Sequence, residues 1–207
     1  MDYKIIILTP TAERVRARYT GSLVELLFYF MRTRIGDGEQ SVSYGILESS
    51  GICSARERMV ADHMAKDWTH VCFIDDDMGF APDTLHILAS RHKPIVGVNY
   101  PHRVPGMGFT AVNVDGKGRI ETNAESTGIE SCAYTGFGFC LIERSVFEQT
   151  EKPWFYLAYD KKADRYSTED AWFCMQTRRA KIPWYVDHDA SKGITHIGPC
   201  EFDWRDV

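Results

Sequence analysis

Three consecutive aspartates follow directly on an apolar run in "VCFIDDDMGF". Like charges packed side by side repel one another, and the repulsion raises the pKa of at least one carboxyl unless a cation lies against them. Carboxylate oxygens suit Mg²⁺ or Mn²⁺, particularly where a phosphate supplies further ligands. Because side chains alternate along an extended chain, Asp75 and Asp77 can share a site while Asp76 points elsewhere. The stretch predicts a divalent metal site, with a solvated acidic turn before Pro82 as the alternative.

A second pair of carboxylates, Glu169 and Asp170, lies in "STEDAWFC" at the start of a predicted helix over residues 168–181. A carboxylate beside a metal-phosphate site can act as general base and take the proton of an attacking hydroxyl. The alternative is local, because Ser167 or Thr168 could cap the helix and acidic residues in its first turn suit its dipole.

One histidine and one arginine could complete such a site. His196 stands in the loop "GITHIGPCEF", where it could add an imidazole ligand to a metal held by two aspartates and a diphosphate. Arg56 lies in the first turn of another predicted helix, where an arginine offers a bidentate partner for phosphate. A structural histidine and a solvated helix face are the alternatives.

Candidates for binding a second substrate come from the later part of the chain. In "TGFGF", Gly136 and Gly138 flank Phe137 and would let a ligand approach the backbone of a strand closely. Trp154 and Trp172 are candidate platforms for stacking on the apolar face of a sugar ring. For each aromatic side chain, a place in the core is the alternative.

The elements that would position these residues alternate along the first half. We expect strands at 4–9, 41–47, 71–74 and 95–98, separated by helices at 21–34, at 54–67 and after Pro82. The motif Ser54-Ala-Arg-Glu57 matches a capping box that would open the middle helix. This order predicts a parallel sheet with helices on both faces, whose ligands bind beyond the carboxyl ends of the strands. Thr9 and Pro10 lie at that edge with the aspartates.

In the second half, 109–114 and 119–122 flank "DGKG" as a candidate hairpin, and a glycine-rich strand enters a short helix near residues 133–147. The chain has 207 residues, 44% of them hydrophobic, which suits one domain. A net charge of −5 excludes a general attraction to nucleic acid or anionic membranes.

No apolar segment is long enough for a membrane span, and the N-terminus lacks signal-peptide features. We therefore expect a protein of the cytoplasm, in a bacterium or a virus-infected host cell. The six cysteines contain no CxxC pair, so we expect reduced, mostly buried thiols.

The ordered set "FIDDDM", "TGFGF", "STEDAWF" and "THIG" resembles the GT-A glycosyltransferases, most closely the small family-2-type enzymes of bacteria and viruses. The resemblance covers nearly the whole chain. It implies a Rossmann-like α/β fold with a mostly parallel central sheet flanked by helices and a smaller antiparallel portion on the acceptor side. It also implies a single domain, residues 1–207, in which 1–100 bind the nucleotide sugar and 101–207 bind the acceptor and carry catalysis.

The resemblance assigns roles to the motif residues. It implies that Asp75 contacts the ribose or the metal, that Asp77 ligates Mn²⁺ or Mg²⁺, and that His196 completes the metal shell. It makes Asp170 the base of an inverting enzyme, with Glu169 beside it. Thr9 and Pro10 would border the nucleotide, and we expect Asp76 and Arg56 to contact the donor.

The sequence thus predicts a metal-dependent hexosyl or deoxyhexosyl transferase that uses a nucleotide diphosphate sugar, with UDP favoured over GDP. Its hydroxyl acceptor is open: a glycan, a lipid-linked sugar, a protein or a modified nucleic-acid base. A retaining enzyme of the same fold and a non-catalytic nucleotide-sugar or carbohydrate-binding protein remain alternatives. A haloacid-dehalogenase-type phosphohydrolase fits less well, because Gly79 stands where its D-x-D-x-T motif has threonine. A sugar nucleotidyltransferase would need a glycine-rich loop after the first strand.

Overall fold

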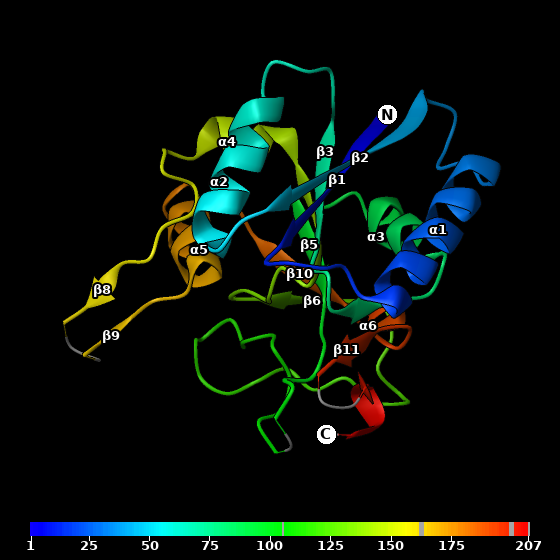
Figure 1. Cartoon of the computed structure of the whole chain (residues 1–207). Helices are drawn as coiled ribbons and strands as arrows, with labels where there is room; N and C mark the ends of the chain where they lie inside the picture. The colour runs from blue at the N-terminus through cyan, green and yellow to red at the C-terminus, as the bar shows by residue number, and fades with distance from the viewer. Residues whose placement is uncertain (105, 162–163, 199–200, 207) are drawn as a thin grey trace.

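The structure is a computed structural model that describes residues 1–104, 106–161, 164–198 and 201–206 (Figure 1). Within these residues a seven-stranded sheet has the order β2-β1-β3-β7-β5-β10-β6. Its strands are β1 (Tyr3–Thr11), β2 (Gln40–Glu48), β3 (His70–Ile74), β5 (Ile95–Val98), β6 (Ile129–Cys132), β7 (Phe139–Glu143) and β10 (Trp184–Asp187).

The sheet is mostly parallel. β1 pairs in parallel with β2 and β3, and β5 pairs in parallel with β10, whereas β7 lies antiparallel between β3 and β5. β6 is antiparallel at the edge beside β10. The predicted α/β class with a mostly parallel central sheet is confirmed, and the late strand β7 separates the two parallel groups.

Helices cover both faces of this sheet, as Figure 1 shows, with α1 and α3 on one side and α2, α4 and α5 on the other. Their bounds are α1 (Ala17–Arg32), α2 (Ile52–His63), α3 (Thr84–Ser90), α4 (Arg144–Gln149), α5 (Glu169–Arg179) and α6 (His188–Ser191). Side chains alternate along β1, so that Ile5 and Ile7 pack with α1 while Ile6 and Leu8 pack with α2. The two hydrophobic clusters hold the strand ends in fixed positions.

Smaller elements surround the main sheet. β4 (Met78–Gly79), β11 (Thr195–Ile197) and β12 (Glu201–Phe202) form an antiparallel sheet in the order β12-β11-β4. β8 (Tyr159–Asp160) and β9 (Arg165–Tyr166) form a separate ladder, and η1 (Trp204–Asp206) is a 3-10 turn. This places the end of the chain against the segment that follows β3.

Several local expectations need correction. The middle helix begins at Ile52 after Gly51, and Ser54 donates to the Gly51 carbonyl, so the predicted capping box does not form. Glu57 instead accepts from the backbone N–H of Phe155 at 2.9 Å. The candidate hairpin around "DGKG" reduces to a turn with one bridge, between Val112 and Arg119.

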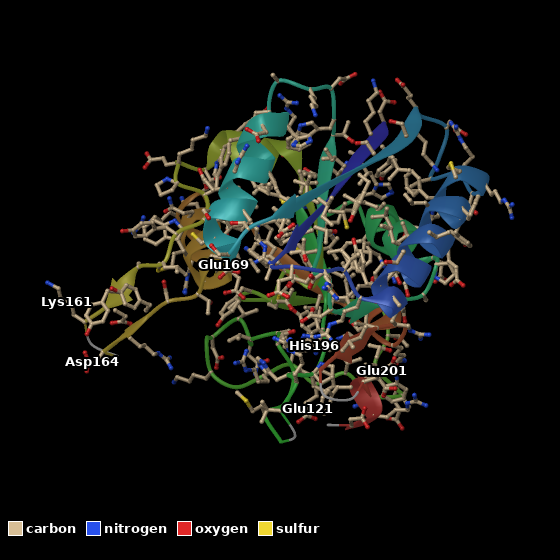
Figure 2. The ribbon with its side chains drawn as sticks, in the orientation of Figure 1. Glu121, Lys161, Asp164, Glu169, His196 and Glu201 are labelled. Atoms are coloured by element: carbon tan, nitrogen blue, oxygen red, sulfur yellow. The ribbon has the colours of Figure 1, made fainter. Side chains whose placement is uncertain are left out.

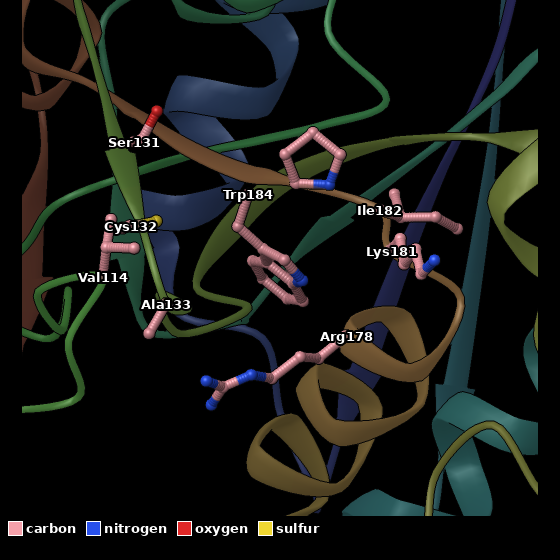
Figure 3. Close-up of a pocket in the computed structure, with 9 residues that line it drawn as sticks. Val114, Ser131, Cys132, Ala133, Arg178, Lys181, Ile182 and Trp184 are labelled. Atoms are coloured by element: carbon pink, nitrogen blue, oxygen red, sulfur yellow. The ribbon is translucent and has the colours of Figure 1, made fainter.

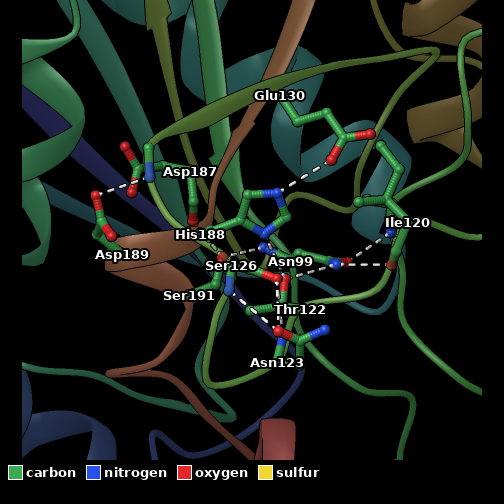
Figure 4. A network of polar contacts seen from close by, with 12 residues as sticks. Asn99, Ile120, Thr122, Asn123, Ser126, Glu130, Asp187, His188, Asp189 and Ser191 are labelled. Atoms are coloured by element: carbon green, nitrogen blue, oxygen red, sulfur yellow. Dashed lines mark hydrogen bonds and ion pairs between the residues drawn. The ribbon is translucent and has the colours of Figure 1, made fainter.

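The long segment between β5 and β6 is held by a buried polar network, shown in Figure 4. The side chain of Asn99 donates to the carbonyl of Ile120 at 2.8 Å and to the hydroxyl of Thr122 at 3.0 Å. Thr122 and Glu130 contact the two ring nitrogens of His188. These bonds replace regular strand pairing in tying the segment to the sheet.

Cys53, Cys72, Cys132, Cys140 and Cys174 are free thiols, as expected, while Cys200 lies outside the described residues. Within the described part of the chain, no helix is long and apolar enough to cross a membrane.

Candidate active site

A cavity of about 310 Å³ lies where β1, β2 and β3 end, which is the edge predicted for ligand binding. α2 also begins there, so the free N–H groups of its first turn favour an anion at this edge. The cavity is lined by Pro10, Thr11, Ala12, Ser49, Ser50, Ile52, the aspartates Asp75, Asp76 and Asp77, and Arg103.

The three aspartates line one cavity but have different partners. Asp75 accepts from Nη2 of Arg56 at 2.5 Å, and Asp76 accepts from the hydroxyl of Thr11 at 2.5 Å. Asp77 forms an ion pair with Nη1 of Arg103 at 2.8 Å. The mutual repulsion of the aspartates is thus offset by two arginines and one hydroxyl, and all three carboxylates can contact a ligand in the cavity.

Arg56 is buried with 2% of its surface exposed, so it does not face the donor cavity as the sequence predicted. Its guanidinium joins Asp75 to Glu169, and it packs over the rings of Phe137 and Phe73 at 5.0 and 5.6 Å. Burial alone would lower the pKa of Arg56, but the charges of Asp75 and Glu169 outweigh that effect and raise it. Arg56 therefore stays charged and fixes the position of two carboxylates.

His196 is brought to Asp77 by the small sheet. β11 pairs with β4 directly after the aspartates, and the N–H of Ile197 donates to the carbonyl of Asp77 at 2.8 Å. The carbonyl of Pro101 can only accept, so Nδ1 of His196 donates to it, at 2.8 Å. The other ring nitrogen, Nε2, then faces Oδ2 of Asp77 at 3.6 Å with a lone pair in the neutral imidazole.

This pair fits a divalent metal, because a neutral Nε2 and a carboxylate that face each other both coordinate cations. Without a metal, burial would raise the pKa of Asp77, but a hydrogen bond and charge from the protonated form of His196, together with the charge of Arg103, outweigh it and lower the pKa of this carboxyl. Within the described residues no three His, Cys, Asp or Glu side chains converge as a metal site. The predicted third ligand, Asp75, lines the same cavity with one oxygen bound to Arg56, and phosphate or water oxygens would have to supply the remaining ligands.

Glu169 and Asp170 form the first turn of α5, but they lie in different surroundings. Glu169 is 9% exposed, and its pKa is raised by burial while Arg56 opposes the shift. One of its carboxylate oxygens is paired with Arg56. Asp170 is half-buried and accepts from the N–H of Ala171 at 2.7 Å and from the hydroxyl of Thr168.

Asp170 does not line the aspartate cavity, but it follows Glu169, which Arg56 ties to Asp75. Its negative charge contributes to raising the pKa of Arg56. The pKa of Tyr100 is raised above all by burial, with the charges of Asp75 and Asp170 adding to the shift. Figure 2 labels two of the candidate site residues, Glu169 at the start of α5 beside α2 and His196 on β11. Unlike Glu169, Asp170 forms no ion pair within the described residues.

The glycines of "TGFGF" serve packing rather than an open acceptor surface. A Cβ on Gly136 or Gly138 would lie 2.2 or 2.6 Å from atoms of the Tyr100 side chain, which is 6% exposed. Phe137 is 2% exposed and packs against Arg56. The prediction that these three residues contact an acceptor is therefore wrong for this structure, since Tyr100 fills the space that the glycines leave.

Trp154 and Thr9 also require correction, whereas the role of Trp172 stays a prediction. Trp154 is 3% exposed and its indole donates to the carbonyl of Phe147, so it cannot stack on a sugar. Trp172 is half-buried, and its indole donates to the carbonyl of Pro153. Thr9 is fully buried and bonded to the hydroxyl of Tyr19, so it does not line the cavity.

Reading the sequence missed other cavity residues, of which Thr11, Ser49, Ser50 and Arg103 carry hydrogen-bonding groups. Thr11 ends β1, and Ser49 and Ser50 directly follow β2. Because ligands of such sheets bind at the carboxyl ends of the strands, these three residues were predictable. Arg103 lies beyond β5 on an irregular segment and carries no such signal in the sequence.

No protein-family model and no curated protein sequence matches the chain. Solved structures do match. The protein A197 from STIV superposes with a TM-score of 0.66 at 15% identity over 99% of this chain and 92% of that one. Drosophila beta1,4galactosyltransferase 7 in complex with xylobiose gives a TM-score of 0.55 at 12% identity, over 95% of this chain and 71% of that one.

GalNAc-T7 with UDP, GalNAc and Mn²⁺ gives a TM-score of 0.59 at 10% identity, over 94% of this chain and 43% of that one. A mutant of the Drosophila enzyme was solved with manganese, UDP-Gal and xylobiose. The chain therefore has a GT-A-like fold, and its structural neighbours include glycosyltransferases that were solved with UDP, a sugar and manganese.

Proposed function

We propose that this chain is a metal-dependent glycosyltransferase that moves a sugar from a nucleotide diphosphate sugar to a hydroxyl acceptor. The observation that carries the proposal is the Arg56 bridge. It ties Asp75, in the aspartate cavity, to Glu169, the neighbour of Asp170. On a GT-A-like fold, the bridge thus connects the proposed diphosphate site to the segment that carries the carboxylate of Asp170.

The donor would bind in the cavity at the ends of β1, β2 and β3. Pro10, Thr11 and the serines that follow β2 would border the nucleotide, and Arg103 would contact its phosphates. A UDP-sugar is favoured, which the UDP-containing neighbours support. Asp77 and His196 would hold Mn²⁺ or Mg²⁺, which when bound supplies Lewis-acid stabilisation of the leaving diphosphate.

Asp170 would act as the general base. It takes the proton of the acceptor hydroxyl while that oxygen bonds to the anomeric carbon and the bond from this carbon to the diphosphate oxygen breaks. Attack from the face opposite the diphosphate inverts the anomeric centre. Glu169 cannot take this part, because it is paired with Arg56.

In this proposal the nucleotide site is built mainly by residues 1–100, with Arg103 added, and the base by residues 101–207. The cytoplasmic location stays a prediction.

Asp170→Asn tests the assignment of the base. The variant should bind the donor as tightly as the unmodified chain, because Asp170 does not line the donor cavity. It should lose transfer by at least about 100-fold, the scale of general base catalysis. Donor binding is measured by calorimetry and transfer by nucleotide release, with Asp62→Asn on the exposed side of α2 as control. Normal transfer by Asp170→Asn would reject the base and favour a retaining mechanism. Donor binding without transfer by the unmodified chain, for any acceptor, would indicate a binding protein.

A further inference from the structure

Four of the five residues expected to bind the acceptor are buried, Trp172 being the exception, and two cavities along α5 supply a different candidate acceptor site. Resting on the proposed function, we propose that the acceptor is an anionic oligosaccharide. It would lie in a groove that starts beside Asp170 and passes Arg178 to reach Trp184. This acceptor groove is lined by α5, β6 and the β8–β9 ladder.

The first part of the acceptor groove is a cavity of about 530 Å³. Thr168 and Ala171, the residues on either side of Glu169 and Asp170, both line it. Tyr134 lines it too, and although its pKa is raised mainly by burial, the charge of Asp170 contributes to the shift. A hydroxyl bound at this end would therefore lie near the proposed base.

The second part is a cavity of about 360 Å³ that shares two lining residues with the first, Ala133 and Arg178. Figure 3 shows Arg178 reaching from α5 below Trp184 towards Ala133, so its side chain lies between the two parts. Arg178 is eight residues after Asp170, which is roughly 12 Å along a helix. The acceptor groove is thus long enough for a chain rather than a single sugar.

The charge of the acceptor groove is mainly positive. Arg165 and Arg178 line the first part, and Arg178 and Lys181 line the second. None of these three forms an ion pair within the described part of the chain. One carboxylate, Asp160, lines the groove opposite Arg165 in the β8–β9 ladder.

This cationic groove stands out because the whole chain has a net charge of −5. It also offers apolar and aromatic surface, with Tyr166 68% exposed at one end and the exposed Pro183 beside the half-buried Ile182 at the other. Sugar rings present apolar C–H faces to such surfaces, and carboxylates or phosphates on the chain would pair with the arginines. An acidic glycan satisfies both requirements.

Calorimetric titration of the full chain, without any donor, tests the acceptor groove independently of the donor cavity. The carboxylate probe is an oligogalacturonate, and its fully methyl-esterified form is the neutral match. The phosphate probe is a phosphorylated malto-oligosaccharide, with the unphosphorylated chain as its match. Arg178→Ala is compared with Arg179→Ala, which removes the same charge from the same helix end but lies outside both cavities.

At least one charged probe should bind about tenfold or more tightly than its neutral match, and the probe that does so identifies the anion. Arg178→Ala should remove this preference and Arg179→Ala should keep it. Equal binding of charged and neutral probes, binding of neither, or equal losses in the two variants would overturn the proposal. Donor binding without probe binding would reject only the acceptor groove. Probe binding without any donor binding would reject only the proposed transferase.

Discussion

Replacing Arg56 by methionine should destabilise the protein far more than any surface charge change. The substitution leaves Asp75 and Glu169 without their shared cation. Both side chains are largely shielded from solvent, with 24% and 12% of their surface exposed. Removing one partner of a buried ion pair costs roughly 3–5 kcal/mol of unfolding free energy. Two charge-assisted hydrogen bonds are lost, each worth about 1.5–3 kcal/mol, so we expect a loss of about 4 kcal/mol.

The size of this loss should depend on pH. Burial already raises the pKa of Asp75 and Glu169 while Arg56 opposes the shift, so removing Arg56 raises both values further. A carboxyl whose pKa is higher in the folded than in the unfolded state destabilises the fold when it is ionised, and protonation removes that penalty. The difference between Arg56→Met and the unmodified chain should therefore shrink as the pH falls from 7 towards about 5.

Urea unfolding followed by tryptophan fluorescence measures both effects. Arg58→Ala is the matched control on the same helix, because Arg58 and Asp62 pair at 3.3 Å with side chains 70% and 60% exposed. It should cost less than about 1 kcal/mol. Adding Glu169→Gln to Arg56→Met should restore part of the loss, since it removes one uncompensated charge. A loss no larger than that of Arg58→Ala, or one independent of pH, would refute the bridging role.

Two further predictions concern stability. Burial lowers the pKa of His70 from 6.5 to about 4. As the pH falls, His70 therefore takes up a proton in the unfolded state before it does so in the folded state. The free energy of unfolding should fall by about 2 kcal/mol between pH 7 and pH 5. His70→Gln should lack this part of the pH dependence in urea unfolding, and an unchanged slope would argue against it. Gly138→Ala should lose about 1–3 kcal/mol because a Cβ would lie 2.6 Å from Tyr100. Gly21→Ala, whose Cβ meets nothing within 4 Å in α1, should gain up to about 1 kcal/mol by thermal unfolding. Equal effects of the two glycine variants would contradict the packing argument.

Local patterns were sufficient for the elements that build the donor edge. The apolar runs at β1, β3 and β5 and the alternation with helices predicted a mostly parallel sheet, and the aspartates do line a cavity at its carboxyl edge. These features follow from the pattern of apolar and polar residues within short segments, and such local patterns are enough to predict strands and helices.

Long-range partners were not predictable in the same way. Arg56 and Glu169 are 113 positions apart, so nothing in either motif indicates that they pair or that Arg56 is buried. β7 inserts antiparallel between β3 and β5, which no alternation of elements predicts. The motif "TGFGF" predicts space for a ligand, but Tyr100 fills that space in the structure. Tyr100 follows a strand far away in the sequence, so the motif itself does not indicate this partner.

Nucleotide release from a panel of UDP-, GDP-, ADP- and CMP-sugars, with Mn²⁺ and with EDTA, tests the central claim most directly. We predict release from one donor class, UDP-sugars first, that requires Mn²⁺ and is lost in Asp77→Ala. Asp206→Ala, an exposed aspartate in η1, is the control and should keep it. Binding of no donor by calorimetry, or release that neither EDTA nor Asp77→Ala affects, would contradict the account.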